Sequence, residues 1–214
     1  MSTDQVVMTA RQRLHEHFRT LLAQSPLAGM SEWVATGAPP PRATLEIDGR
    51  PDLRWAFNQV WGFSVPCAEA VAALVELSPL VEIGAGSAYW TALLSAAGAD
   101  IIATDLAPSG VGEHGFEVAA YAPVEQLGAV EAVERYPDRA VFCSWPTQGA
   151  EWCFEAVGAL RLRRLFAIIA EPPDGIAGST SLFELLEHDF NILQRVALPR
   201  LYDRRDSLTI YRRT

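Results

Sequence analysis

Residues 80–91 have the sequence LVEIGAGSAYWT, and this stretch decides the fold. Leu80–Ile83 is a short apolar run interrupted by one carboxylate, Glu82, which is typical of a buried strand. Gly84 and Gly86 follow at once, and a helix-compatible run comes after them. Glycine in such a turn lets a ligand approach the backbone closely. The stretch therefore predicts a strand, a nucleotide-cradling turn and a helix.

A second apolar strand is expected over residues 101–104, and it runs into Asp105. Asp105 lies 19 residues beyond Gly86, a spacing at which an acidic side chain accepts hydrogen bonds from ribose hydroxyls. An ionised carboxylate suits this role because it is purely an acceptor. The alternative interpretation of Asp105 is a helix N-cap or turn residue.

Together these motifs resemble the class I S-adenosylmethionine-dependent methyltransferases. The first motif of that family is a hydrophobic strand followed by Glu/Asp-x-Gly-x-Gly, and its second strand ends in an acidic residue. The resemblance spans about residues 55–213. It implies S-adenosyl-L-methionine as the cofactor, held by Glu82, Gly84, Ala85, Gly86, Tyr89, Trp90, Asp105, Leu106, Ser144 and Trp145.

Two positions depart from related turns. Tyr89 stands where a dinucleotide-binding fingerprint has its third glycine, which counts against NAD or FAD. Ala88 stands where many methyltransferases have the third glycine of a Gly-x-Gly-x-Gly motif, and alanine is a small change.

The remaining chain alternates short apolar strands with helical segments, which indicates a largely parallel sheet with helices on both faces. We expect helices at 88–97, 124–135, 150–159 and 181–188, and strands at 80–83, 101–104, 116–119, 140–144, 165–170, 191–198 and 207–212. The last two strands are joined by too few residues for a helical crossover, so they should be antiparallel neighbours. The predicted fold is α/β: a doubly wound, mostly parallel seven-stranded sheet with an antiparallel last strand and a helical N-terminal extension.

The first third of the chain precedes this pattern. Residues 1–66 are expected to form a helical extension or lid, and residues 67–214 the S-adenosylmethionine-binding methyltransferase domain. Apolar residues recur at helical spacing from Val7 to Leu22, and a short strand and turn are expected at 45–51. Aromatic residues then cluster before the core, and they either fold over the cofactor or fill the junction with the N-terminal helix.

Candidate acceptor contacts lie in that aromatic segment and at the ends of later strands: Trp61, Phe63, Pro146 and Glu171. Ligands of open α/β sheets bind at the carboxyl edge, so Glu171 is also a candidate base, with loop capping as its alternative. His114, in a glycine-rich loop, is the other candidate base, with a solvated loop histidine as its alternative. Residues 121–124 are expected to pack on the adenine.

The bulk composition limits the class of partner. Half of the residues are hydrophobic and a fifth are charged, as in an ordered globular protein. The formal charge of −9 disfavours nucleic acid as a partner. The three cysteines have no metal-ligand spacing, and no run has the length of a membrane span. We therefore expect a cytoplasmic monomer or homodimer with no bound metal and no membrane contact.

The sequence thus predicts a methyltransferase that acts on a small-molecule or peptidic acceptor by in-line methyl transfer. An activated sulfonium needs little beyond positioning of the nucleophile, so a catalytic residue need not be visible. Two alternatives stay open. One is a non-catalytic binding or scaffold protein with the same fold, and the other is a nicotinamide-dependent oxidoreductase.

Overall fold

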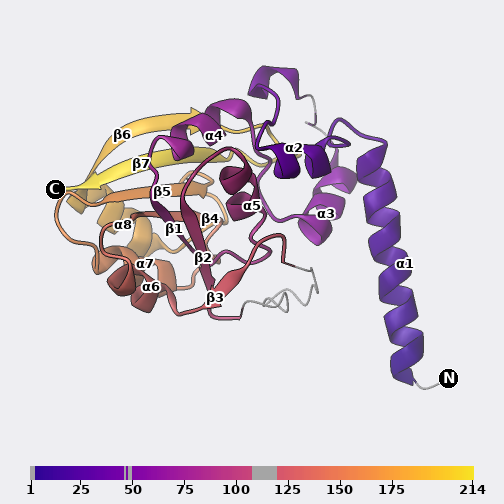
Figure 1. The fold of residues 1–214 in the computed structure, drawn as a ribbon, viewed down its shortest axis with the longest axis horizontal. Helices are drawn as coiled ribbons and strands as arrows, with labels where there is room; N and C mark the ends of the chain where they lie inside the picture. The colour runs from indigo at the N-terminus through magenta and orange to yellow at the C-terminus, as the bar shows by residue number, and fades with distance from the viewer. Residues whose placement is uncertain (1–2, 46, 48–49, 108–119) are drawn as a thin grey trace.

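The computed structural model describes residues 3–45, 47, 50–107 and 120–214, and it centres on a seven-stranded sheet (Figure 1). The strand order is β3-β2-β1-β4-β5-β7-β6. Strand β7 runs antiparallel to both β5 and β6, and the other pairings are parallel. The strands are β1 (Leu80–Ile83), β2 (Ile101–Asp105), β3 (Val124–Gln126), β4 (Ala140–Ser144), β5 (Leu165–Ala170), β6 (Phe190–Ala197) and β7 (Ser207–Arg213). This arrangement confirms the predicted α/β class and the antiparallel last strand.

Alternating side chains of the central strands are buried on opposite faces of the sheet, which is why the strands read as continuous apolar runs. Leu80 and Phe142 belong to the cluster on the face covered by the first helices of the chain and the helix after β1, whereas Val81 and Val141 belong to the cluster on the opposite face. The two helix layers lie on either side of the sheet in Figure 1. The helices after β1 are α5 (Tyr89–Ala96), α6 (Ala129–Arg135), α7 (Trp152–Gly158) and α8 (Thr180–Asp189).

The described part of the N-terminal segment, residues 1–66, is mainly helical and packs against the helix layer on one face of the sheet. Its elements and the helix that follows are α1 (Thr3–Ala23), α2 (Met30–Thr36), a 3-10 turn η1 (Arg42–Thr44), α3 (Pro51–Val60) and α4 (Ala68–Val75). Helix α1 extends away from the body, with the N-terminus at its far end (Figure 1). Helix α2 packs on α5, and Gly37 permits this approach because a Cβ there would lie 2.2 Å from the backbone nitrogen of Ala97. Side chains of α2 and α3 share one buried cluster with the sheet.

Two segments differ from the sequence prediction. Residues 124–126 form strand β3 instead of the start of a helix, because Glu125 and Gln126 pair with Thr104 and Asp105 of β2. The strand expected at 116–119 lies outside the described residues. Within 45–51, the described residues Leu45, Ile47 and Arg50 are not in a strand, and α3 begins at Pro51. Proline suits that first helical position because the N–H it lacks would have no helical partner.

The described helices include none with both the length and the apolar character needed to cross a bilayer.

Candidate functional site

The loop after β1 has three left-handed residues in alternation. Gly84, Gly86 and Ala88 have φ angles of 63°, 53° and 55°. Glycine adopts this region without a steric penalty, which explains two of the three positions. A Cβ at Gly86 would meet no atom within 4 Å, whereas a Cβ at Gly84 would lie 2.6 Å from the ring of Trp152. Open space for a ligand therefore lies over Gly86, and the space at Gly84 is filled by Trp152.

Asp105, the last residue of β2, fixes this glycine loop. Its Oδ2 accepts a hydrogen bond from the Gly86 N–H at 2.9 Å, and its Oδ1 accepts one from the Ala107 N–H at 2.8 Å. The neighbouring Thr104 carbonyl accepts a second hydrogen bond from the glycine loop, from Ala85 N–H at 3.0 Å. An ionised carboxylate has about four lone-pair sites. Asp105 can therefore hold the loop and still accept further hydrogen bonds.

Glu82 is a buried carboxyl in β1, just before the glycine loop. Its side chain is 2% exposed, and Thr91 Oγ1 donates a hydrogen bond to its Oε2 at 2.5 Å. Burial raises the pKa of Glu82 to about 8; the charge of Asp105 adds to this rise, and the hydrogen bond from Thr91 opposes it. Glu82 is therefore mainly protonated at neutral pH, and a cation bound beside it would favour its ionised form.

A cavity of about 1150 Å³ lies where these residues meet, at the carboxyl edge of the sheet. Its lining includes all ten predicted cofactor contacts, namely Glu82, Gly84, Ala85, Gly86, Tyr89, Trp90, Asp105, Leu106, Ser144 and Trp145. Trp61, Phe63 and Pro146 of the predicted acceptor contacts line it as well. A site for one small molecule measures roughly 300–1000 Å³. The cavity is therefore slightly larger than a typical site for one small molecule.

Stacked aromatic rings form the side of the cavity contributed by the N-terminal segment. Phe63 stacks on Trp145 with ring centroids 5.3 Å apart, and Trp61 stacks on Tyr121 at 4.5 Å. Tyr121 also donates a hydrogen bond to the Val60 carbonyl at 2.7 Å. Tyr121 was expected beside the adenine, but it is not among the described residues that line the cavity. Ring contacts thus join the N-terminal segment to the loop before β3 and to the loop after β4.

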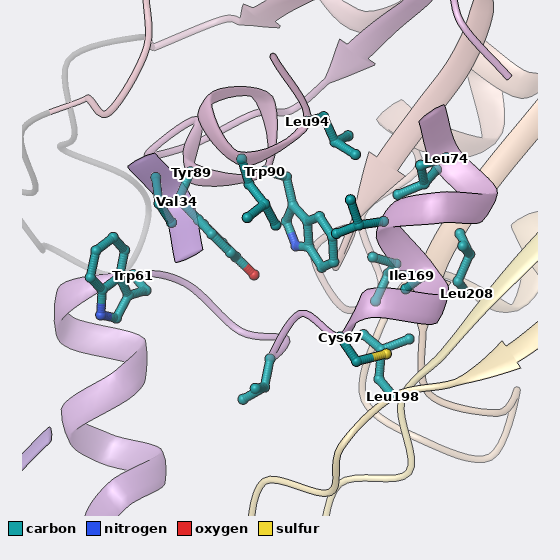
Figure 2. Close-up of a cluster of buried hydrophobic side chains, with 14 of the residues drawn as sticks. Val34, Trp61, Cys67, Leu74, Tyr89, Trp90, Leu94, Ile169, Leu198 and Leu208 are labelled. Carbon is teal, nitrogen blue, oxygen red and sulfur yellow. The ribbon is translucent and has the colours of Figure 1, made fainter. Parts of the chain in front are cut away.

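Ser64 is the centre of a buried polar cluster next to the cavity. Tyr89 O–H donates to the Ser64 carbonyl, and Trp90 Nε1 donates to Ser64 Oγ at 3.1 Å. Ser64 Oγ is also 3.0 Å from Ser144 Oγ at the end of β4. Figure 2 shows Tyr89 and Trp90 side by side on α5, with the Tyr89 hydroxyl directed toward the chain that follows Trp61. Both rings are nearly fully buried and leave the cavity open.

Glu171 directly follows β5 and forms a largely buried ion pair. Its Oε2 is 2.7 Å from Arg204 Nη1 and accepts a hydrogen bond from Ile176 N–H at 3.1 Å. The two side chains are 4% and 13% exposed. Glu171 is not among the described residues that line the cavity. The other candidate base, His114, lies outside the described residues.

Several lining residues were not identified from the sequence. Trp152 opens the helix after β4, and the rule that ligands meet the carboxyl ends of strands would have pointed to this position. The lining residues after β3 have no signal in the sequence analysis, because residues 124–135 are predicted there as one helix and the strand end at Gln126 is not recognised. The further lining residues from these regions are Leu127, Gly128, Ala129, Val130, Glu131, Glu134, Thr147, Gln148 and Glu155.

The strand order and the glycine loop at the carboxyl edge define a seven-stranded Rossmann-like α/β protein, the fold that the resemblance to class I methyltransferases implies. No family model matches the chain, and no curated protein matches it.

Several solved structures are similar to this chain at low identity. One comes from work on the conversion of a disulfide bond into a thioacetal group during echinomycin biosynthesis. It is 14% identical over 68% of this chain and 81% of its own, with a TM-score of 0.46. TrmN from Thermus thermophilus is 13% identical over 69% of this chain and 48% of its own, with a TM-score of 0.46. Magnesium protoporphyrin IX methyltransferase (ChlM) from Synechocystis PCC 6803, with bound SAM, is 16% identical over 68% and 79%, with a TM-score of 0.44.

Proposed function

We propose that this cavity binds S-adenosyl-L-methionine and that the protein transfers the methyl group to a small-molecule or peptidic acceptor. The observation that carries the proposal is the juxtaposition of Asp105 with the open face of Gly86 in one cavity. A carboxylate at the end of β2 suits ribose hydroxyls, and a glycine with open space at its Cβ position suits a ligand that crosses the backbone.

The lining residues fit the parts of this cofactor. Asp105 would accept hydrogen bonds from the ribose, and Leu106 and Leu127 offer apolar contacts to a flat base. Glu82 would face the cationic methionine end, where its ionised form becomes favourable. The volume left beside a bound cofactor would hold the acceptor, against Phe63 and Trp145.

Once bound, the cofactor would supply an activated methyl group on a sulfonium. The residues of this chain then need to hold the acceptor nucleophile in line and to exclude water, and positioning of this kind is worth up to about 7–11 kcal/mol. We assign this task to Trp61, Phe63 and Pro146, with the N-terminal segment acting as the acceptor lid. Glu171 is assigned a structural role because Arg204 already holds its carboxylate.

The charge of the lining favours a neutral or cationic acceptor over nucleic acid. The described lining residues include one guanidinium, that of Arg54. They also include five carboxyl groups: Glu82, Asp105, Glu131, Glu134 and Glu155. Arg54 is itself paired with Asp203 at 3.1 Å. Such a lining repels phosphate backbones.

A scaffold protein with a closed cleft is the second candidate function. It would be favoured if bulky side chains filled the methionine end of the cavity. Tyr89 and Trp90 instead direct their polar atoms to Ser64 and belong to the core. The open cavity therefore favours ligand binding.

Isothermal titration calorimetry with S-adenosylmethionine tests the proposal. Wild-type protein should bind, and Gly86→Asn should bind at least tenfold more weakly because its side chain enters the open space. Gly98→Asn is the matched control, because Gly98 also has a positive φ with no atom near its Cβ and does not line the cavity. Absence of binding by wild-type protein would reject the proposal.

A further inference from the structure

Asp206 is a buried carboxyl that none of the sequence motifs includes. It directly precedes β7, and its side chain is 3% exposed. Both carboxyl oxygens are buried and lack a hydrogen-bond partner among the described residues. Trp145 Nε1 is the other buried side-chain atom in the described chain with this property. An unpaired acceptor and an unpaired donor are therefore buried in the same molecule.

These groups are neighbours. The indole N–H of Trp145 lies close enough to Asp206 to lower the pKa of the carboxyl, although the two do not form a hydrogen bond with good geometry. Leaving a buried donor and a buried acceptor unpaired is unfavourable for both. A small rotation of the indole that brings Nε1 to a carboxylate oxygen would satisfy both groups at once.

Trp145 also forms part of the cavity wall. Its φ of 57° is in the left-handed region, which is rare for a bulky residue and marks strained positions near functional sites. Its backbone N–H donates to the Ile169 carbonyl at 2.8 Å, while its ring lines the cavity and stacks on Phe63. A movement of the indole therefore changes the aromatic wall formed by Phe63 and Trp145.

We propose that Asp206 is a positioning residue for this wall: its ionised carboxylate holds the Trp145 indole N–H by a charge-assisted hydrogen bond, and its protonated form holds it so weakly that the ring is released. The Phe63–Trp145 wall thereby takes up two positions that depend on pH. The consequence for acceptor binding rests on the proposed function, whereas the pairing of Asp206 with Trp145 does not.

The groups around Asp206 place this change near neutrality. Burial is the largest effect and raises the pKa of Asp206 to about 7; the negative charge of Glu171 adds to the rise, and Arg204 and Arg54 oppose it. The charge of Asp206 also raises the pKa of the Tyr89 hydroxyl on α5. The indole is therefore released below about pH 7 and held above it.

The test uses the indole ¹H–¹⁵N signals of the six tryptophans. The Trp145 signal is identified by its absence from Trp145→Phe. In wild-type protein this indole proton should move downfield between pH 5.5 and 8.5, with a midpoint near pH 7. Asp206→Asn should abolish the movement, because asparagine does not titrate. Asp174→Asn, which removes an exposed carboxylate paired with Arg205, should leave it unchanged.

A second measurement does not require Asp206→Asn to fold. The carboxyl ¹³C signal of Asp206 should titrate at a higher pH in Trp145→Phe than in wild-type protein, since the donor that favours ionisation is gone. A pH-independent Trp145 signal, a movement that persists in Asp206→Asn, or an unchanged Asp206 midpoint would each overturn the proposal. An intact titration in a protein that does not bind S-adenosylmethionine would support the pairing and reject its link to methyl transfer.

Discussion

The carboxylate of Asp105 accepts a hydrogen bond from the backbone N–H of Gly86 at 2.9 Å, which joins the end of β2 to the loop after β1. The two residues are 19 positions apart in the sequence, and they meet because β1 and β2 are neighbouring parallel strands. The same carboxylate thus shapes the glycine loop and lines the cavity.

Replacing Asp105 by alanine should therefore weaken S-adenosylmethionine binding in two ways. It removes the acceptor for the ribose and leaves Gly86 N–H without its partner. Hydrogen bonds to a charged group contribute about 1.5–3 kcal/mol, so the Kd should rise at least about tenfold in calorimetry. Asp100→Ala is the control, since Asp100 precedes β2 at the opposite edge and pairs with Arg139. An unchanged Kd in Asp105→Ala would contradict this role.

The sequence predicted the parts of the fold whose signal is local. Strands β4 and β5 are almost entirely apolar, β1 is apolar apart from Glu82, and the turn after β1 is marked by Gly84 and Gly86. Strand β3 has no such signal, because Val124–Gln126 is short and partly exposed and is held by pairing with Ala103–Asp105. The sequence pattern predicts a helix here, but pairing with β2 overrides this local preference and makes the segment a strand.

The site residues at strand ends could also be predicted from the sequence, whereas those placed by tertiary packing could not. Residues at the ends of β1, β2 and β4 were found because the carboxyl edge of a parallel sheet collects ligand contacts. Asp206 was not found, since its burial depends on how the loop before β7 packs against Trp145 and Arg204. The same carboxyl-edge rule points to Trp152, which opens the helix after β4, but its contact with Gly84 joins elements far apart in the chain and has no local signal.

Glu82 should make stability fall as pH rises. Its pKa in the folded protein, about 8, is above its ordinary value of 4.5. Its stabilising effect is therefore complete below about pH 4.5 and is lost as pH rises toward 8, by up to about 1.4 kcal/mol per pH unit. Urea unfolding from pH 5 to 8 should show this slope in wild-type protein and a flatter curve in Glu82→Gln. Exposed Glu76→Gln should keep the wild-type slope, and parallel curves for wild type and Glu82→Gln would refute the burial effect.

Gly84 and Gly86 should differ in what alanine does to stability. Both have positive φ angles, so each substitution should cost roughly 1–2 kcal/mol from the backbone. At Gly84 the new Cβ also meets Trp152, which adds about 1–3 kcal/mol of overpacking. Urea unfolding should therefore give Gly84→Ala a clearly lower free energy of unfolding than Gly86→Ala. Equal losses would mean that the indole of Trp152 moves aside without cost.

Glu171 should act on stability and not on chemistry. Removing Arg204 with Arg204→Met leaves a buried carboxylate uncompensated, which costs about 3–5 kcal/mol. The double variant Arg204→Met with Glu171→Leu should recover much of that loss, because neither charge is then buried. The exposed pair of Arg205 and Asp174 is the control, and Arg205→Met should change the free energy of unfolding by at most about 1 kcal/mol. Once an acceptor is known, a Glu171→Gln protein that is fully folded but inactive would instead assign Glu171 to catalysis.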